Sequence, residues 1–116
     1  MWFKMPKSVP RAYSNYTLEA LSLLAGLIRV ARIEQRMSAQ EVADRAGISR
    51  GMLLRIEKAD PKCEIGATFE VARIVGVNLF EVESSRLVMQ VKHVEEKLAL
   101  LPKSARRVKK VVKDDF

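Results

Sequence analysis

The residues whose chemistry stands out are two arginines, Arg50 and Arg55, in the stretch "SAQEVADRAGISRGMLLRIEKA" over residues 38–59. A guanidinium group donates two hydrogen bonds to O6 and N7 of guanine, and it is the commonest specific reader of that base. The chemistry on offer is therefore recognition. No nucleophile–base pair, metal-ligand cluster or glycine-rich phosphate loop can be assembled, so we expect no enzyme, no metal and no cofactor.

Two start signals around one glycine predict two short helices in this stretch. Ser38 and Glu41 match a capping box, in which the hydroxyl and the carboxylate each satisfy a free backbone N–H. That helix ends at Gly47, because glycine adopts a left-handed backbone most easily. Ser49 then caps a second helix over about 50–58. Helices joined by so short a turn cross at a steep angle, which is the helix-turn-helix arrangement.

The second of these helices would have one face on the protein and one face in solvent. Leu53 and Ile56 would hold it to the core. Its width fits the major groove of B-DNA, with the first helix lying across the phosphate backbone. The alternative, that the two helices serve only packing or protein contact, stays open. The outward positions are Ser49, Arg50, Gly51, Met52, Leu54 and Arg55.

Apolar residues at intervals of three and four predict further helices around this pair. The first covers about 18–36, with Thr17 as its N-cap and Leu18 on its inward face. Another covers 66–75, and we expect a turn with a short helix over 76–82. With no strand pattern between them, these elements indicate an all-α fold.

The C-terminal part repeats apolar residues in steps of four, three, four and three, which is the pattern of a heptad seam. It predicts a helix over 86–101 that Pro102 ends. Two uses remain open, because two heptads are short for a free coiled coil: packing on its own domain, or joining two copies of the chain. The seam residues are Leu87, Val91, Val94, Leu98 and Leu101.

The charge of the chain is concentrated at its two ends. Of 116 residues, 21 are Lys or Arg and 14 are Asp or Glu, which gives a net charge of +7. Residues 1–16 are expected to form a flexible basic arm, and residues 102–116 a basic tail. Basic ends suit a polyanionic partner, since neutralised phosphates release counterions. Solvated ends without a partner are the alternative.

The apolar runs of the sequence are too short for a membrane protein. The longest, residues 20–28, has nine residues, whereas a spanning helix needs about 20. Cys63 is the only cysteine, so neither a disulfide nor a cysteine-based metal site can form within the chain. A single free thiol fits a reducing compartment, and we expect a cytoplasmic protein with no membrane partner.

Residues 24–82 resemble the Cro/repressor-type, or Xre-like, helix-turn-helix family. The residues that carry the resemblance are "LLAGLIRVARIEQRMSAQEVADRAGISRGMLLRIEKADP" and "VARIVGVNLFEV", about half of the chain. The resemblance implies a Cro/repressor-like bundle of about five helices plus a C-terminal helix. Its domains would be the arm 1–16, a DNA-binding domain 17–83, a dimerisation or packing helix 84–101 and the tail 102–116.

The resemblance also assigns roles to individual residues. Arg32 and Glu57 align with a buried arginine–glutamate pair of the family that ties the first helix to the recognition helix. We therefore expect these two residues to stabilise the fold and not to contact DNA. Breaking a buried pair costs roughly 3–5 kcal/mol. The base-edge positions of the family fall on Arg50, Gly51, Met52 and Arg55.

Two departures from the family pattern alter the expected contacts. Ala39 stands where the family usually has glutamine, and Gln40 follows one place later, so a phosphate contact is lost or redirected. Gly51 has no side chain to read a base, and it lowers helix stability by about 1 kcal/mol relative to alanine. The candidates for phosphate contact are Gln40, Ser49, Lys58 and Lys62.

The resemblance implies that the chain binds operator sites in double-stranded DNA as a homodimer and represses transcription. A dimer is expected because one half-site contacts too few bases. Proteins of this length with a basic tail ending in "DDF" are also similar to antitoxins encoded beside HipA-type kinase toxins. That likeness implies an alternative role, in which the chain binds and neutralises a partner toxin and represses its own operon.

Overall fold

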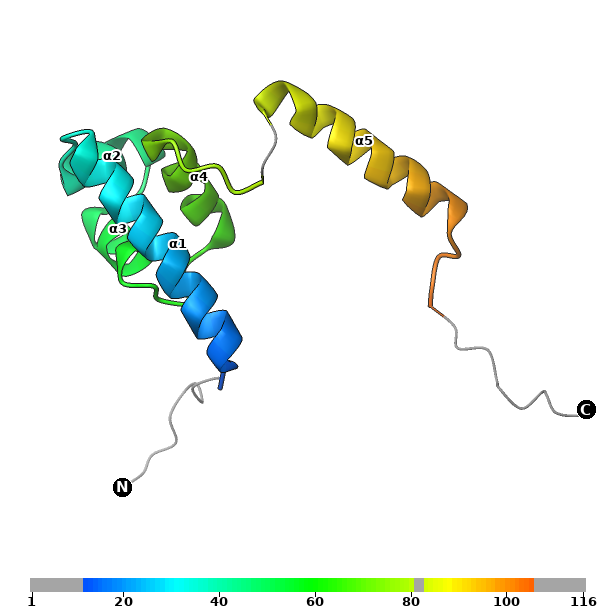
Figure 1. Cartoon of the computed structure of the whole chain (residues 1–116), viewed down its shortest axis with the longest axis horizontal. Coiled ribbons are helices and arrows are strands. Elements are labelled where there is room, and N and C mark those ends of the chain that lie inside the picture. Colours follow the sequence, from blue (N-terminus) through cyan, green and yellow to red (C-terminus); the bar gives the residue numbers. More distant parts are fainter. Residues whose placement is uncertain (1–11, 81–82, 106–116) are drawn as a thin grey trace, which may run out of the picture. The chain divides into compact units, whose positions relative to one another are not determined.

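The computed structural model describes residues 12–80 and 83–105, and within them every regular element is an α-helix. This confirms the all-α class. The chain divides into two units after Phe80, the first with four helices and the second with one (Figure 1). The helices are α1 (Asn15–Glu34), α2 (Ala39–Ala46), α3 (Arg50–Glu57), α4 (Ile65–Val75) and α5 (Ser84–Leu100).

The core of the first unit lies where α2 packs on both α3 and α4, and where α1 packs on the same two helices. Figure 1 shows these helices beside the C-terminal part of α1, whose first turns extend beyond them. Leu18, which the spacing placed inward, is accordingly 42% exposed. The buried side chains come from all four helices: Ala25 and Ile28, Val42 and Ala43, Leu53 and Ile56, and Val71, Ala72 and Val75.

The start of α1 differs from the expectation that Thr17 caps it. Ser14 has an extended backbone, and its hydroxyl accepts a hydrogen bond from the backbone N–H of Thr17 at 3.2 Å. The helix therefore begins at Asn15, three residues earlier than expected. Both hydroxyl side chains can satisfy a free N–H, and the apolar pattern, which starts later, does not distinguish them.

Each helix of the first unit is stopped by a residue in the left-handed region, one or two places after its last helical residue. α2 and α4 are stopped by Gly47 and Gly76, whose φ angles are 71° and 87°. α1 and α3 are stopped by Arg36 and Ala59, whose φ angles are 59° and 64°. A residue with a Cβ loses about 1 kcal/mol or more in this conformation, so two of the four stops carry strain.

The residue after each stop donates its backbone N–H to the carbonyl five residues earlier. The N···O distances are 3.1 Å for Met37, 3.0 Å for Ile48 and Asp60, and 2.8 Å for Val77. These bonds satisfy carbonyl groups that the end of a helix leaves free, and an apolar contact usually accompanies them. Met37, Ile48 and Val77 make that contact with the core, whereas Asp60 is polar.

The segment after α4 forms no helix over residues 76–80, so the short helix expected over 76–82 is wrong for this part; 81 and 82 lie outside the described residues. Val77 and Leu79 both pack against the core. Side chains two residues apart point the same way in an extended chain and not in a helix. The segment is instead a turn followed by bends, and its contacts with the core come from this alternate pair.

Replacing Arg36 by glycine should raise the free energy of unfolding by about 0.5–1 kcal/mol. The variant Arg36→Gly removes a Cβ from a left-handed position, and Arg36 is exposed, so no packing is lost. Gly47→Ala is the matched control, and it should lower the free energy of unfolding by about 1 kcal/mol because it adds a Cβ to the same conformation. Urea unfolding followed by circular dichroism measures both. A destabilised Arg36→Gly chain would contradict this account of the α1 stop.

Candidate nucleic-acid interface

Side-chain caps hold both helix starts of the α2–α3 pair. Ser38 and Glu41 form the expected capping box, with N···O distances of 3.0 Å to the Ser38 hydroxyl and 2.7 Å to the Glu41 carboxylate. The hydroxyl of Ser49 accepts from the backbone N–H of Met52 at 3.0 Å and caps α3. Gly47 stops α2 between the two caps. The turn is fixed on both sides, which gives α3 a defined start.

One face of α3 is buried and the other is exposed. Leu53 is fully buried and Ile56 is 4% exposed, so these two side chains anchor the helix. Arg50 and Gly51 lie exposed in the first turn, and Arg55 is exposed one turn later. The Arg50 guanidinium takes part in none of the hydrogen bonds or ion pairs among the described residues. It is therefore available to a ligand.

Two of the outward positions are less open than expected. Met52 and Leu54 are half-buried, and Met52 packs against the core. Met52 lies one turn before the buried Ile56, on the same side of the helix. Its sulfur accepts a hydrogen bond from Nη2 of Arg55 at 3.6 Å. Met52 thus supports Arg55 as well as bordering the exposed face.

Arg55 is exposed, but its own chain positions it. Its Nε lies 3.7 Å from Oδ2 of Asp60, and its side chain keeps 55% of its surface exposed. An exposed ion pair of this kind contributes about 0–1 kcal/mol. A ligand can therefore take over the guanidinium at small cost, while Asp60 limits the directions in which it points before binding.

Asp60 is a site residue that the sequence did not reveal, since Asp60-Pro61 indicated only a break in the helix. It occupies the place after the Ala59 stop, where the other three helix ends put an apolar residue. Its Oδ1 also accepts from the backbone N–H of Lys62 at 2.9 Å. The sequence did hold one signal: Asp60 follows Arg55 by five residues at the end of a helix. A left-handed residue between them turns the chain so that the two side chains meet.

The four candidates for phosphate contact are all exposed, but they are not equally free. The hydroxyl of Ser49 uses a lone pair to cap α3 and keeps its O–H for another acceptor. The amide of Gln40 donates to Oδ1 of Asp44 at 2.9 Å, one turn along α2. That carboxylate disfavours a phosphate beside Gln40. Lys58 and Lys62, at and after the end of α3, are the more open cations.

Arg32 and Glu57 form a bidentate ion pair between α1 and the end of α3. Nε and Nη2 of Arg32 donate to the two carboxylate oxygens at 2.6 and 3.0 Å, and Nη1 donates to the Met37 carbonyl at 3.0 Å. The two side chains are 13% and 5% exposed. The hydrogen bond to Glu57 raises the pKa of Arg32, although burial acts against it. One charged side chain therefore joins α1, the α1–α2 turn and α3.

Cys63 lies half-buried in the loop between α3 and α4 and packs against the core. Burial raises the pKa of its thiol, the Asp60 carboxylate raises it further, and Arg55 opposes both. The thiol therefore stays neutral near pH 7. It adds no negative charge beside Arg55.

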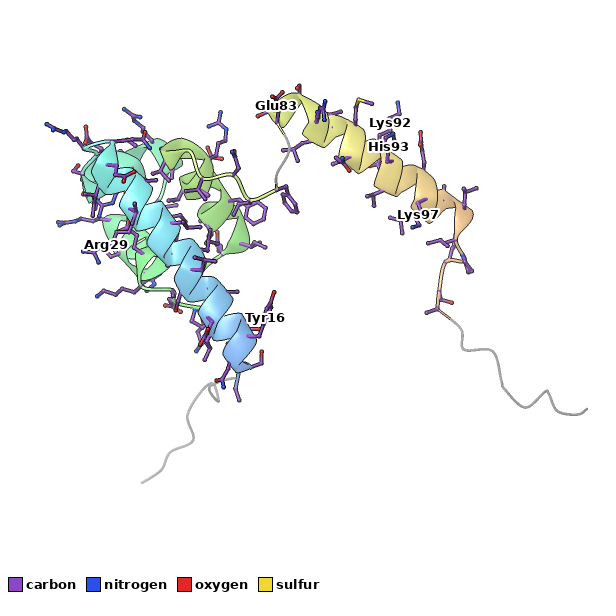
Figure 2. The ribbon with its side chains drawn as sticks, in the orientation of Figure 1. Tyr16, Arg29, Glu83, Lys92, His93 and Lys97 are labelled. Atoms are coloured by element: carbon purple, nitrogen blue, oxygen red, sulfur yellow. The ribbon has the colours of Figure 1, made fainter. Side chains whose placement is uncertain are left out.

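The predicted seam runs along α5 and is exposed. No residue of this 17-residue helix is buried, and His93, near its middle, is exposed as well (Figure 2). Leu101 lies one place past the helix with an extended backbone, so the helical part of the seam ends at Leu98. The seam residues expose 40–61% of their surface: Leu87, Val91, Val94, Leu98 and Leu101.

Within residues 12–80 and 83–105, no three His, Cys, Asp or Glu side chains gather where they could hold a metal ion. In the same part of the chain, no helix combines the length and the apolar character needed to cross a bilayer. The arm expected over 1–16 is shorter than expected, because α1 already includes Asn15. Residues 1–11 of the arm and 106–116 of the basic tail lie outside the described residues.

Breaking the Arg32–Glu57 pair should destabilise the first unit. Arg32→Met leaves the carboxylate without its partner. Removing one member of a fully buried pair costs roughly 3–5 kcal/mol, and we expect up to about 3 kcal/mol for this part-buried one. The double variant Arg32→Met/Glu57→Met leaves no unpaired charge and should recover a large part of that loss. Calorimetric unfolding compares the three chains. A double variant no more stable than Arg32→Met would count against the pair as described.

Comparisons of the chain with protein-family models, with curated proteins and with solved structures found no match. What the molecule offers is its own geometry: a capped turn, an anchored α3 and two exposed guanidinium groups. Exposed guanidinium groups on an anchored helix suit contact with an anionic ligand.

Proposed function

We propose that the chain is a sequence-specific DNA-binding transcriptional regulator of the Cro/repressor type, a cytoplasmic repressor that binds operator DNA as a homodimer. The observation that carries the proposal is the exposed face of α3, where Arg50 and Arg55 flank Gly51. Arginine suits this position because its planar fork of donors matches both the guanine edge and a phosphate.

Gly51 supports a close approach of the ligand to α3. A Cβ at this position would meet only the Ser49 hydroxyl oxygen, at 3.9 Å, so the fold has room for a side chain. Glycine in a helix lowers stability by about 1 kcal/mol relative to alanine, so the fold gains nothing from it. A base pair in contact with the backbone between the two arginines gives a reason for the absent side chain.

In the proposed mode α3 enters the major groove and α2 crosses the phosphate backbone. Ser49 at the start of α3 and Lys58 at its end then bind phosphates on the two sides of the groove, and Lys62 extends the second contact. Asp60 keeps Arg55 directed along this face until DNA replaces it. Phosphate contacts supply affinity, and the two arginines supply sequence preference.

A homodimer follows from the size of the recognition helix. α3 has eight residues, and a helix of this kind reaches base edges with only three or four side chains. Two copies on half-sites about 34 Å apart double those contacts. The exposed α5 seam offers one surface for a second copy. The alternative antitoxin role depends on residues 102–116, and no observation on the described residues favours it.

Arg50→Ala and Arg55→Ala should each weaken binding to a duplex selected from random-sequence DNA by the unmodified protein. A bidentate contact to guanine is worth about 1–3 kcal/mol, which corresponds to roughly 5- to 150-fold in Kd. Arg73→Ala is the matched control, because Arg73 is an exposed arginine on α4. Fluorescence anisotropy measures Kd, and circular dichroism verifies the fold. The proposal fails if the unmodified chain selects no sequence, or if both arginine variants bind like Arg73→Ala.

Gly51→Ala should move stability and DNA binding in opposite directions. Alanine in place of a helical glycine with free space should raise the free energy of unfolding by about 0.5–1 kcal/mol. The same methyl group obstructs the DNA and should raise Kd for the selected duplex about tenfold, equivalent to about 1.4 kcal/mol. Gly66→Ala on α4 is the control, since a Cβ there meets nothing within 4 Å and Gly66 lies outside α3. Equal DNA affinities for the two variants would exclude a close approach at Gly51.

A further inference from the structure

The face of α1 that points away from the core is apolar, and the described first unit leaves it uncovered. Tyr16 is 83% exposed, and the other four members expose between 48% and 65% of their surface. On the opposite side of the helix, Ala25 and Ile28 are buried. Contiguous exposed apolar patches mark contact surfaces on soluble proteins. The α1 outer face consists of Tyr16 (labelled in Figure 2), Leu23, Leu27, Val30 and Ile33.

Gly26 lies in the middle of the α1 outer face. It is exposed, its φ is not positive, and a Cβ there would meet nothing within 4 Å, so neither conformation nor packing in the described chain requires glycine. Glycine in a helix interior is destabilising. Leu23 and Val30 lie one turn before and one turn after it, so the bare backbone forms a notch between two apolar side chains. A notch of this kind lets a second helix approach closely.

Charged residues towards the two ends of this face complement each other. Glu19 lies near the start of α1, and Arg29, which is labelled in Figure 2, lies farther along it. Neither residue makes an ion pair among the described residues. They are ten residues apart, about 15 Å along the helix, which is too far for them to pair within one copy. Two antiparallel copies that cross between Leu23 and Gly26 bring each Glu19 beside the other copy's Arg29. A parallel crossing would oppose like charges.

We propose that the α1 outer face is a self-complementary interface, in which α1 of one copy packs antiparallel against α1 of a second copy. The inference rests on the homodimer of the proposed function and names the surface that forms it. A twofold contact uses the same patch on both subunits, and this face supplies an apolar centre, a central notch and two symmetric ion pairs. Because Arg32 ties α1 to Glu57 of α3, the contact also fixes the recognition helix relative to the dimer axis.

Sedimentation equilibrium of the full chain measures the dissociation constant of the dimer. Gly26→Leu and Leu23→Asp should each raise it about tenfold or more, as expected for central interface positions. Gly26→Ala should also raise it, while the urea midpoint of the monomer rises because a helical glycine is removed. Val94→Asp, at a similarly exposed valine on α5, should raise it less than Leu23→Asp does.

Charge exchange tests the pairing without adding bulk to the interface. Glu19→Arg and Arg29→Glu should each weaken the dimer, and the chain with both changes should dimerise like the unmodified protein, because complementarity is restored. A chain that sediments as a monomer overturns both the homodimer and this inference. A dimer that keeps its dissociation constant in every α1 variant but dissociates in Val94→Asp overturns this inference alone and assigns the contact to α5.

Discussion

The ion pair between Arg32 and Glu57 is the interaction on which the rest of the structure depends. It joins residues 25 positions apart, and the remaining donor of the guanidinium holds the Met37 carbonyl. Two charges withdrawn from water are stable only while every hydrogen bond is made. Their bidentate geometry is met in this orientation of α3 on α1. The pair therefore favours this arrangement of α3 on α1, and the position of the exposed arginines on α3 depends on it.

Local signals predicted most of the fold. The capping box and Gly47 placed the start and the end of α2, because caps and stops are encoded within one turn of the chain. The sequence did not show which of two capping residues starts α1. Ser14 and Thr17 both carry a hydroxyl group, and Ser14 is the cap. The segment 76–80 was not predictable, since contacts of alternate side chains with the core shape it.

The candidate site was predictable in its residues more than in its contacts. The exposed arginines follow from the Ser49 cap and from the apolar residues of α3. The role of Asp60 does not, because the spacing of Arg55 and Asp60 brings the two side chains together only through the left-handed backbone of Ala59. The sequence also did not show that Gly26 and Gly51 lie where a side chain would fit. Only a structure shows that a side chain would fit at both positions, which directs attention to ligands outside the chain.

The uniform way in which the four helices stop bears on how fast the first unit folds. Each stop is closed by a hydrogen bond that spans five residues, so it forms from the local chain and waits for no distant partner. Domains dominated by contacts between near neighbours in sequence fold in microseconds to milliseconds. Bringing Arg32 and Glu57 together across 25 positions costs more chain entropy than closing any one of these stops. We therefore expect the helices to form before α3 is aligned on α1.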